Sequence, residues 1–201
     1  AEKAQNTLLD YAQHLQTSYL RPPHIEFLAE KLEAVERGDI TRLAISMPPR
    51  HGKSELASNF FPSWFLGRNT MRDERFSQVF SNVQLDDTSQ SARRFGTNKL
   101  GTYFAVGAGG AITGRGAHLL IVDDIIKGRE DADSTAIRRS VTDWYKSVAY
   151  TRLMPGGRIV IVGTRWHEAD LLGFVLEEAT HEPWEVINLP AIADEDDQLG
   201  R

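Results

Sequence analysis

The strongest constraint on the fold is an alternation of short apolar strands with amphipathic helices. Four apolar runs have the length of strands and are bounded by turn residues: "TRLAISMPP", "HLLIVDD", "RIVIVG" and "WEVINLP". Helical spacing of apolar residues recurs between these runs. Because successive parallel strands need a crossover, usually a helix, the pattern predicts an α/β domain with a mostly parallel central sheet.

Four helices are expected around these strands. Their apolar faces are Ile25, Leu28, Leu32 and Val35; Leu56, Phe60 and Trp64; Ile137, Val141, Trp144 and Val148; and Leu171, Leu172, Val175 and Leu176. Gly38 is expected to stop the first helix. Pro62 is expected to kink the second helix or end it early.

One region does not fit the alternation. Another buried strand should follow the second helix, but residues 68–90 are polar with few apolar positions. Residues 91–107 instead predict a β-hairpin insertion that turns near Asn98–Gly101 and leads into a glycine-rich loop. We hypothesise that residues are absent from the sequence around the Thr70–Met71 junction.

Composition excludes several classes of protein. The chain has 201 residues, a net charge of −5 and no cysteine, which rules out disulfides and thiolate metal sites. It shows no signal-peptide pattern and no apolar run long enough to cross a bilayer, so no membrane association is expected. The negative charge gives no global attraction for nucleic acid, so any DNA contact must be local or belong to an assembly.

The first candidate site is "MPPRHGKSELAS", residues 47–58, where Gly-Lys-Ser lies between a predicted strand and a predicted helix. Amide groups at a helix N-terminus favour phosphate, and Gly52 permits close approach of the backbone. Lys53 can reach the β- and γ-phosphates, and Ser54 can ligate Mg²⁺. Met47 replaces the usual opening glycine. The stretch is therefore either a specialised phosphate loop or an ordinary loop–helix junction.

The second candidate is the pair of carboxylates that ends the strand "HLLIVDD". Ligands of α/β sheets bind at the carboxyl ends of strands, where Asp123 and Asp124 lie. Asp123 is suited to holding Mg²⁺, and Asp124 to orienting or deprotonating an attacking water. Read alone, the pair is also compatible with a solvated turn.

The third candidate is Gly163-Thr164-Arg165, which follows the strand "RIVIVG". Small, hydrogen-bonding and cationic groups at this edge could sense the γ-phosphate and pass its loss to the next helix. A plain strand–helix connection is the alternative.

Two arginines are candidates for stabilising charge during phosphoryl transfer. Arg50 lies inside the predicted phosphate loop, and Arg115 lies between two glycines before the acidic strand. Either could act as a finger, in cis or on a neighbouring subunit. An exposed arginine in a glycine loop is otherwise simply solvated. The histidines show no metal-ligand spacing, and the acidic run Asp194–Asp197 is interpreted as a solvated linker.

Several segments in order resemble the large terminase subunit of tailed bacteriophages: "MPPRHGKSELAS", "GGAITGRGAHLLIVDD", "WYKSVAYTRLMPGGRIVIVGTRWHEADLLG" and "WEVINLPAIADEDDQLGR". The resemblance covers most of the chain and is weakest across residues 68–95. Family members are ATP-driven motors that package double-stranded DNA into a procapsid. They join an ATPase domain to a C-terminal nuclease domain.

The resemblance implies a P-loop NTPase fold of the ASCE/RecA-like kind, a three-layer sandwich. Residues 1–190 would form the ATPase domain, and residues 191–201 would begin a linker towards a nuclease domain that this chain lacks. The full-length protein would then also be an endonuclease, but this fragment would not.

The resemblance also assigns roles to residues. The nucleotide-binding set is Pro49, Arg50, His51, Gly52, Lys53, Ser54, Glu55, Tyr19, Arg21 and His24. The last three match an adenine-binding element only loosely, and a plain helix N-terminus fits them equally. Ser54 and Asp123 would hold the metal; Asp124, Lys53, Arg50 and Arg115 would be catalytic; Gly163, Thr164 and Arg165 would couple hydrolysis to motion. Many relatives carry glutamate where this chain has Asp124.

The expected function is an ATP-hydrolysing packaging motor that uses Mg²⁺. Its expected partners are double-stranded DNA, the small terminase subunit and the portal protein, in the host cytoplasm. We expect a homo-oligomeric ring when assembled, and a monomer with weak DNA binding in isolation. The alternatives are a helicase-like DNA-dependent ATPase and a nucleotide-binding scaffold that does not hydrolyse.

Overall fold

The computed structural model describes residues 2–66, 78–81, 83–91, 94–98, 101–107, 110, 112, 114–177, 181–195 and 197–200. The chain divides into two compact units. One comprises Ala1–Glu33 with Glu55–Val106, and the other Ala34–Ser54 with Gly107–Arg201. The Thr70–Met71 junction lies outside the described residues, so the hypothesis of a missing segment stays untested.

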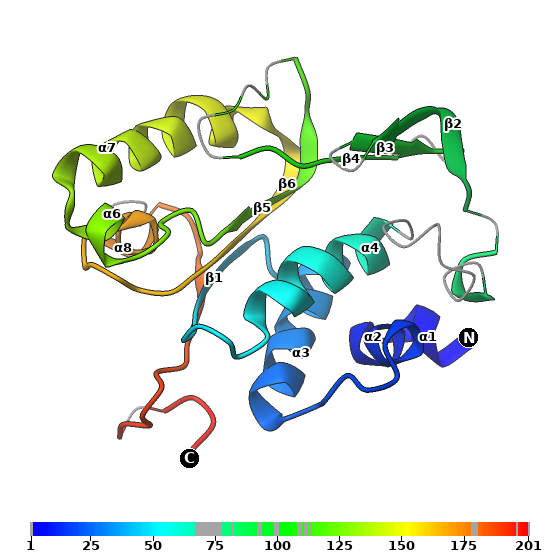
Figure 1. The fold of residues 1–201 in the computed structure, drawn as a ribbon, viewed down its shortest axis with the longest axis horizontal. Helices are drawn as coiled ribbons and strands as arrows, with labels where there is room; N and C mark the ends of the chain where they lie inside the picture. The colour runs from blue at the N-terminus through cyan, green and yellow to red at the C-terminus, as the bar shows by residue number, and fades with distance from the viewer. Residues whose placement is uncertain are drawn as a thin grey trace. The chain divides into compact units, whose positions relative to one another are not determined.

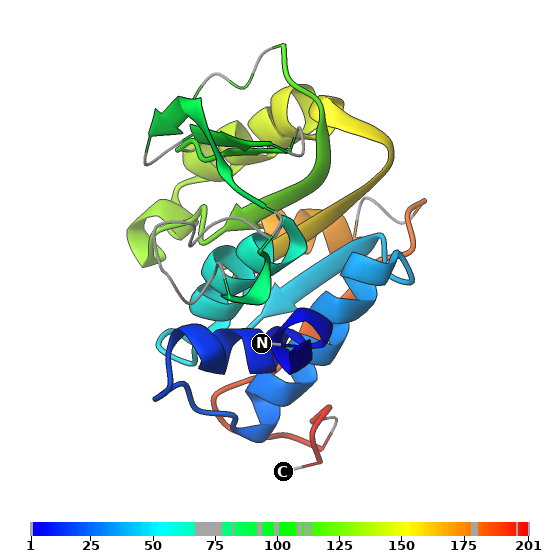
Figure 2. The same cartoon turned by 90° about the vertical axis from the view of Figure 1, so that its right-hand side faces the viewer.

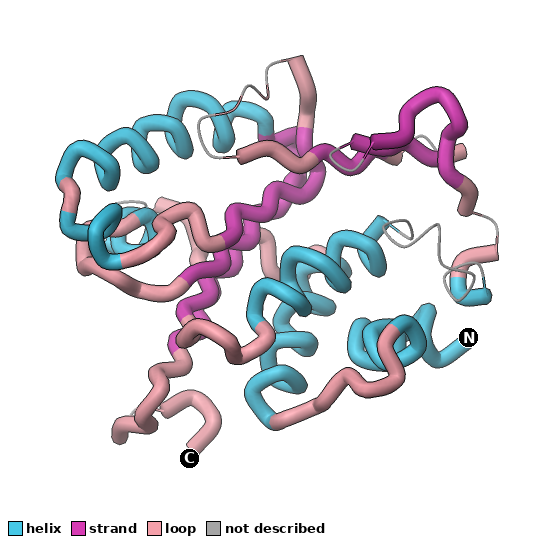
Figure 3. Tube along the Cα trace, in the orientation of Figure 1, coloured by secondary structure: helices cyan, strands magenta, loops and turns pink. Residues whose placement is uncertain are grey.

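A four-stranded sheet in the order β5-β6-β1-β7 forms the centre of the second unit. The strands are β1 (Arg42–Ser46), β5 (Ala117–Asp123), β6 (Leu153–Gly163) and β7 (Glu185–Asn188). All three pairings are parallel, so the predicted α/β class and parallel sheet are confirmed. Figures 1 and 2 show β1, β5 and β6 alongside one another, and Figure 3 traces the strands in magenta. Strand β6 begins at Leu153, earlier than predicted.

Helices on one side of this sheet complete the core of the second unit (Figure 1). They are α6 (Arg129–Asp133), α7 (Thr135–Trp144), the π-helical η2 (Tyr145–Ala149), the 3-10 turn η3 (Tyr150–Arg152) and α8 (Leu171–Glu177). Val141 of α7 and Leu172 of α8 are buried in one cluster with Val122 and Ile161 of the strands. These apolar residues meet as the sequence predicts, whereas Ile137, expected on the same face of α7, is 37% exposed.

The first unit is mostly helical. It contains α1 (Glu2–Asn6), α2 (Leu8–Leu15), most of α3 (Pro23–Arg37), the π-helical η1 (Glu55–Phe60) and α4 (Phe61–Leu66). The Thr7 side chain accepts the Asp10 N–H and caps α2. Gly38 follows α3 with φ of 89°, a conformation that favours glycine and confirms the predicted stop.

Of the two outcomes expected at Pro62, a kink or an early end of the helix, the early end is wrong and the kink stays a prediction. Helix α4 runs through Pro62, which lies in the first turn after the π-helical η1. Proline is tolerated in a first turn, because its missing N–H needs no partner there. The Ser63 hydroxyl donates to the carbonyls of Asn59 and Phe60, at 2.9 and 2.7 Å, and so satisfies carbonyls at the junction.

The predicted hairpin is confirmed within a small antiparallel sheet of the first unit. Strands β2 (Leu85–Ser91), β3 (Arg94–Thr97) and β4 (Thr102–Phe104) pair in sequence order. The Thr97 N–H donates to the Gly101 carbonyl at 3.0 Å, so the turn lies where the sequence placed it. Strand β2 was not predicted, because "LDDTSQS" has no apolar alternation.

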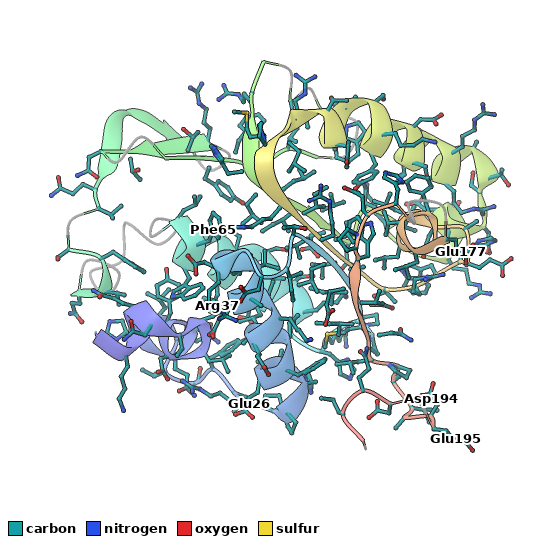
Figure 4. The ribbon with its side chains drawn as sticks, turned by 180° about the vertical axis from the view of Figure 1, so that it is seen from behind. Glu26, Arg37, Phe65, Glu177, Asp194 and Glu195 are labelled. Carbon is teal, nitrogen blue, oxygen red and sulfur yellow. The ribbon has the colours of Figure 1, made fainter. Side chains whose placement is uncertain are left out.

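The segment after β7 belongs to the second unit. Asp194 and Glu195, from the run interpreted as a solvated linker, are exposed on this segment in Figure 4; Asp196 lies outside the described residues. Among the described helices, none combines the length and hydropathy of a membrane span.

An ion pair that is largely shielded from solvent stabilises the sheet at the start of β1. The Arg42 Nε atom lies 2.6 Å from Glu182 Oε1, and the two side chains are only 13% and 11% exposed. The Tyr150 hydroxyl donates to the same Glu182 oxygen at 2.9 Å. Arg42 also donates to the Gly157 carbonyl at 3.1 Å, so it connects β1 to the first half of β6.

We expect Arg42→Ala to lower the free energy of unfolding by about 3 kcal/mol, because Glu182 would stay largely shielded from solvent without its cation. The control is Arg37→Ala, which removes a pair with Asp39 that is 54% and 62% exposed. That change should cost less than about 1 kcal/mol. Urea unfolding of both variants measures the difference, and equal costs would contradict a stabilising role for the shielded pair.

Candidate functional site

Three adjacent strands of the second unit bring the predicted site residues to one edge. In the parallel register Ser46 of β1 lies opposite Gly163 of β6, and Val162 lies opposite Asp123 of β5. Two further backbone bonds continue the register past the strand ends. The Met47 N–H donates to the Gly163 carbonyl at 3.1 Å, and the Asp124 N–H donates to the Val162 carbonyl at 2.9 Å. The carboxyl ends therefore meet, as expected for a ligand site of an α/β sheet.

The loop after β1 has an unusual backbone. Arg50 has φ of 62° and Gly52 has φ of 77°, and the helix begins at Lys53. Pro49, Arg50 and His51 are exposed, and His51 Nδ1 lies 2.8 Å from the Pro49 carbonyl. Left-handed residues before a helix N-terminus can direct backbone N–H groups into an anion-binding concavity.

Lys53 is a buried cation at the centre of the site. Its side chain is 5% exposed, and its Nζ lies 3.3 Å from Asp124 Oδ2. The same ammonium donates to Thr164 Oγ1 at 3.2 Å. The Thr164 hydroxyl in turn donates to the Met47 carbonyl at 3.2 Å. A buried charge needs such partners, so one network joins the ends of β1, β5 and β6.

Ser54 brings a hydroxyl to the two carboxylates. Its Oγ donates to Asp123 Oδ1 at 2.8 Å and lies 3.4 Å from Asp124 Oδ2. Hydroxyl and carboxylate oxygens suit Mg²⁺, which usually takes few protein ligands and keeps several waters or substrate phosphates. Among the described residues no three acidic or imidazole groups form a metal cluster. Ser54 Oγ and Asp123 Oδ1 are oxygen ligands of the kind that Mg²⁺ accepts.

Asp124 has a strained backbone. Its φ is 39°, a value rare for residues other than glycine, asparagine and aspartate. Its side chain is 45% exposed, whereas the side chain of Lys53 beside it is buried. Backbone strain of this kind persists where the surroundings fix it, and it concentrates at functional sites.

The third predicted segment, Gly163-Thr164-Arg165, makes contacts in different places. Thr164 contacts Lys53, and buried Gly163 packs closely, because a Cβ there would lie 3.3 Å from Leu172 Cδ1. Arg165 instead turns towards the start of α8, where its Nε lies 3.4 Å from Asp170 Oδ1. The structure thus places Thr164, but not the Arg165 guanidinium, in the Lys53 network.

Other predicted site residues are not brought into this network. Tyr19, Arg21, His24 and Glu55 belong to the first unit, so their assignment to the nucleotide stays a prediction. Arg115 precedes β5, whereas Asp123 ends it. Eight residues of extended chain correspond to about 25 Å, so Arg115 does not reach the carboxylates of its own chain.

The described residues of the adenine-binding candidate have structural partners of their own. Arg21 forms an ion pair with Asp10 at 2.5 Å, and this pair holds the pKa of the Asp10 carboxyl below its usual value. The buried Tyr19 ring packs edge-on against Phe60, with 5.1 Å between the centroids. Burial, and secondarily the Glu55 carboxylate, raise the pKa of Tyr19 to about 12.

Asp170 is a buried residue beside the site that is not among the residues predicted from sequence. This carboxylate is 3% exposed and receives three backbone N–H groups around the start of α8. The signal was available, because an aspartate directly before a helical apolar pattern marks an N-cap.

A scan against protein-family models matches none, and a search of curated proteins finds no similar sequence. The family of the chain is therefore not shown, and the terminase resemblance stays a prediction.

The backbone of the loop yields a direct test. We expect Arg50→Gly to be more stable than Arg50→Ala by about 1 kcal/mol, because only glycine adopts a positive φ without steric cost. Both variants remove the same exposed side chain, so their difference in urea unfolding isolates the backbone term. An alanine variant as stable as the glycine variant would contradict the left-handed conformation at residue 50.

Proposed function

We propose that the second unit binds Mg·ATP at the carboxyl ends of β1, β5 and β6 and hydrolyses it. In the fuller proposal, the chain is the ATPase motor domain of a viral terminase large subunit that translocates double-stranded DNA. One observation carries the proposal. The buried Lys53 and its neighbour Ser54 begin the helix after the loop, and they lie within 3.4 Å of Asp124 and Asp123 at the end of β5.

The loop supplies the phosphate-binding groups of the proposed site. The N–H groups around Gly52 and the helix N-terminus favour phosphate, and Lys53 adds a full positive charge. Ser54 and Asp123 would hold the magnesium ion, which bridges phosphate oxygens and neutralises their charge. The 2.8 Å bond between Ser54 Oγ and Asp123 Oδ1 supports this pairing of ligands.

Asp124 is the proposed catalytic carboxylate. It lies 3.3 Å from Lys53 Nζ, the group that is to bind phosphate, and it is 45% exposed. A triphosphate would compete with Asp124 for the ammonium, because both are anions. Release from Lys53 would leave Asp124 able to accept a hydrogen bond from the attacking water and orient it.

The order of the sheet supports the ASCE/RecA-like class. Strand β6 lies between the phosphate-loop strand β1 and the acidic strand β5, an order that is compatible with a P-loop-like sandwich. Thr164 at the end of β6 contacts Lys53 and is placed to respond to the γ-phosphate, as the coupling proposal requires.

Arg50 and Arg115 are proposed to act as arginine fingers in different ways. Arg50 lies in the loop itself and is the candidate for action in cis. Arg115, at the far end of β5, is the candidate for action on a neighbouring subunit. Action in trans would require the homo-oligomeric ring, with the small subunit and portal protein as further proposed partners.

We expect Lys53→Ala and Asp124→Asn each to lower the kcat of ATP hydrolysis at least about 100-fold, because each removes a charge from the transition-state environment. The two variants should differ in their affinity for an ATP analogue. Asp124→Asn should still bind an ATP analogue, whereas Lys53→Ala should bind it weakly. Phosphate release and titration with a fluorescent analogue measure the two quantities.

Exposed residues of the same type serve as controls. Lys127→Ala and Asp133→Asn remove exposed charges outside the network and should leave both measurements unchanged. Activity that survives both site changes would refute the site. If the unmodified chain binds the ATP analogue but does not hydrolyse ATP, the scaffold alternative is favoured. If single-stranded DNA strongly stimulates its ATP hydrolysis, the helicase-like alternative is favoured.

A further inference from the structure

Asp170 is a buried carboxylate without a role in the proposed chemistry. Among the described residues, Lys53 and Asp170 are the charged side chains that are buried, at 4% and 3% exposure. Burying a carboxylate is costly unless hydrogen bonds replace its water. The groups that surround Asp170 therefore indicate what it holds in place.

The two oxygens of Asp170 hold different parts of the backbone. Oδ1 accepts the Gly173 N–H at 3.0 Å and lies 3.4 Å from Arg165 Nε, so it caps α8. Oδ2 accepts the N–H groups of Trp166 and His167, at 3.2 and 3.4 Å. One side chain thus fastens the turn after β6 to the start of the next helix.

The turn and the helix are also in direct contact. A Cβ at Gly173 would lie 1.7 Å from the Glu168 carbonyl oxygen, so the turn lies against the helix backbone. The Arg165 guanidinium donates to the same carbonyl at 3.2 Å. A displacement of α8 would therefore displace the turn.

Thr164 directly precedes this turn and contacts the centre of the proposed site. Its hydroxyl accepts from Lys53 Nζ and donates to the Met47 carbonyl, each at 3.2 Å. On one side of Thr164, Gly163 belongs to β6; on the other side, the Trp166 N–H two residues later donates to Asp170 Oδ2. The backbone that presents the Thr164 hydroxyl is thereby fixed at both ends.

We propose that Asp170 is a positioning residue: it holds the turn 165–169 so that Thr164 presents its hydroxyl to Lys53. Asp170 itself touches no reacting group. This inference rests on the proposed ATPase function for its kinetic consequence. If Asp170 holds the turn in this way, the turn 165–169 and α8 are together the element that moves when the γ-phosphate is lost.

Asp170→Ser separates positioning from helix capping. Serine is a good N-cap, so the Gly173 N–H keeps an acceptor, whereas Trp166 and His167 lose theirs. The amide hydrogens of Trp166 and His167 should then exchange faster, measured by NMR, while those of β1 and β5 keep their rates. The kcat of ATP hydrolysis should fall about 10- to 100-fold, as small misplacements do. The KM for ATP should change less than about threefold.

A double-mutant cycle distinguishes positioning from general damage. If Asp170 acts through Thr164, the double variant Asp170→Ser/Thr164→Val should have nearly the kcat of Thr164→Val alone. If the two substitutions lower kcat by factors that multiply in the double variant, the proposal is overturned. Unchanged exchange rates of the Trp166 and His167 amide hydrogens would overturn it as well. If the unmodified chain hydrolyses no ATP, the proposed function fails, and the exchange experiment still decides whether Asp170 holds the turn.

Discussion

The ammonium of Lys53 is the group on which the site depends. A cation that is 5% exposed needs anionic and polar partners, and these come from the ends of β5 and β6. The parallel register that sets Val162 opposite Asp123 brings them together. A shift of one residue would turn the side chains of β5 to the opposite face. The burial of one side chain thus depends on the register of the whole sheet.

Strained backbone occurs on both sides of this network. Arg50 and Asp124 are the described non-glycine residues with positive φ, at 62° and 39°. One lies in the loop before Lys53 and the other directly after β5. A strained conformation costs free energy and persists only where other contacts fix it. Both strained residues are also among the site residues that the sequence predicts.

The sequence predicted the parts of the fold that apolar periodicity determines. Strands β1, β5 and β7 and helices α3, α7 and α8 lie where their patterns placed them. Strand β2 was missed because most of its residues are polar, so no apolar period marks it in the sequence. At the site, Lys53, Ser54 and Asp123 were predicted to converge and do so. The contact between the Arg165 side chain and Asp170 was not predicted, because it depends on the side-chain conformation of Arg165, which the spacing of residues in the sequence does not determine.

The backbone at residue 124 favours an aspartate as the second carboxylate. A glutamate would carry its carboxylate further from the backbone, because its side chain has one more methylene group. With φ of 39°, the position favours aspartate, because a short polar side chain tolerates the left-handed region better than a long one. The same short side chain reaches Lys53 at 3.3 Å and lies 3.4 Å from Ser54. Reach towards a substrate is therefore limited by a backbone conformation that also makes the Lys53 contact possible. An ATPase built on this residue would have to bring its water closer to β5 than one built on glutamate.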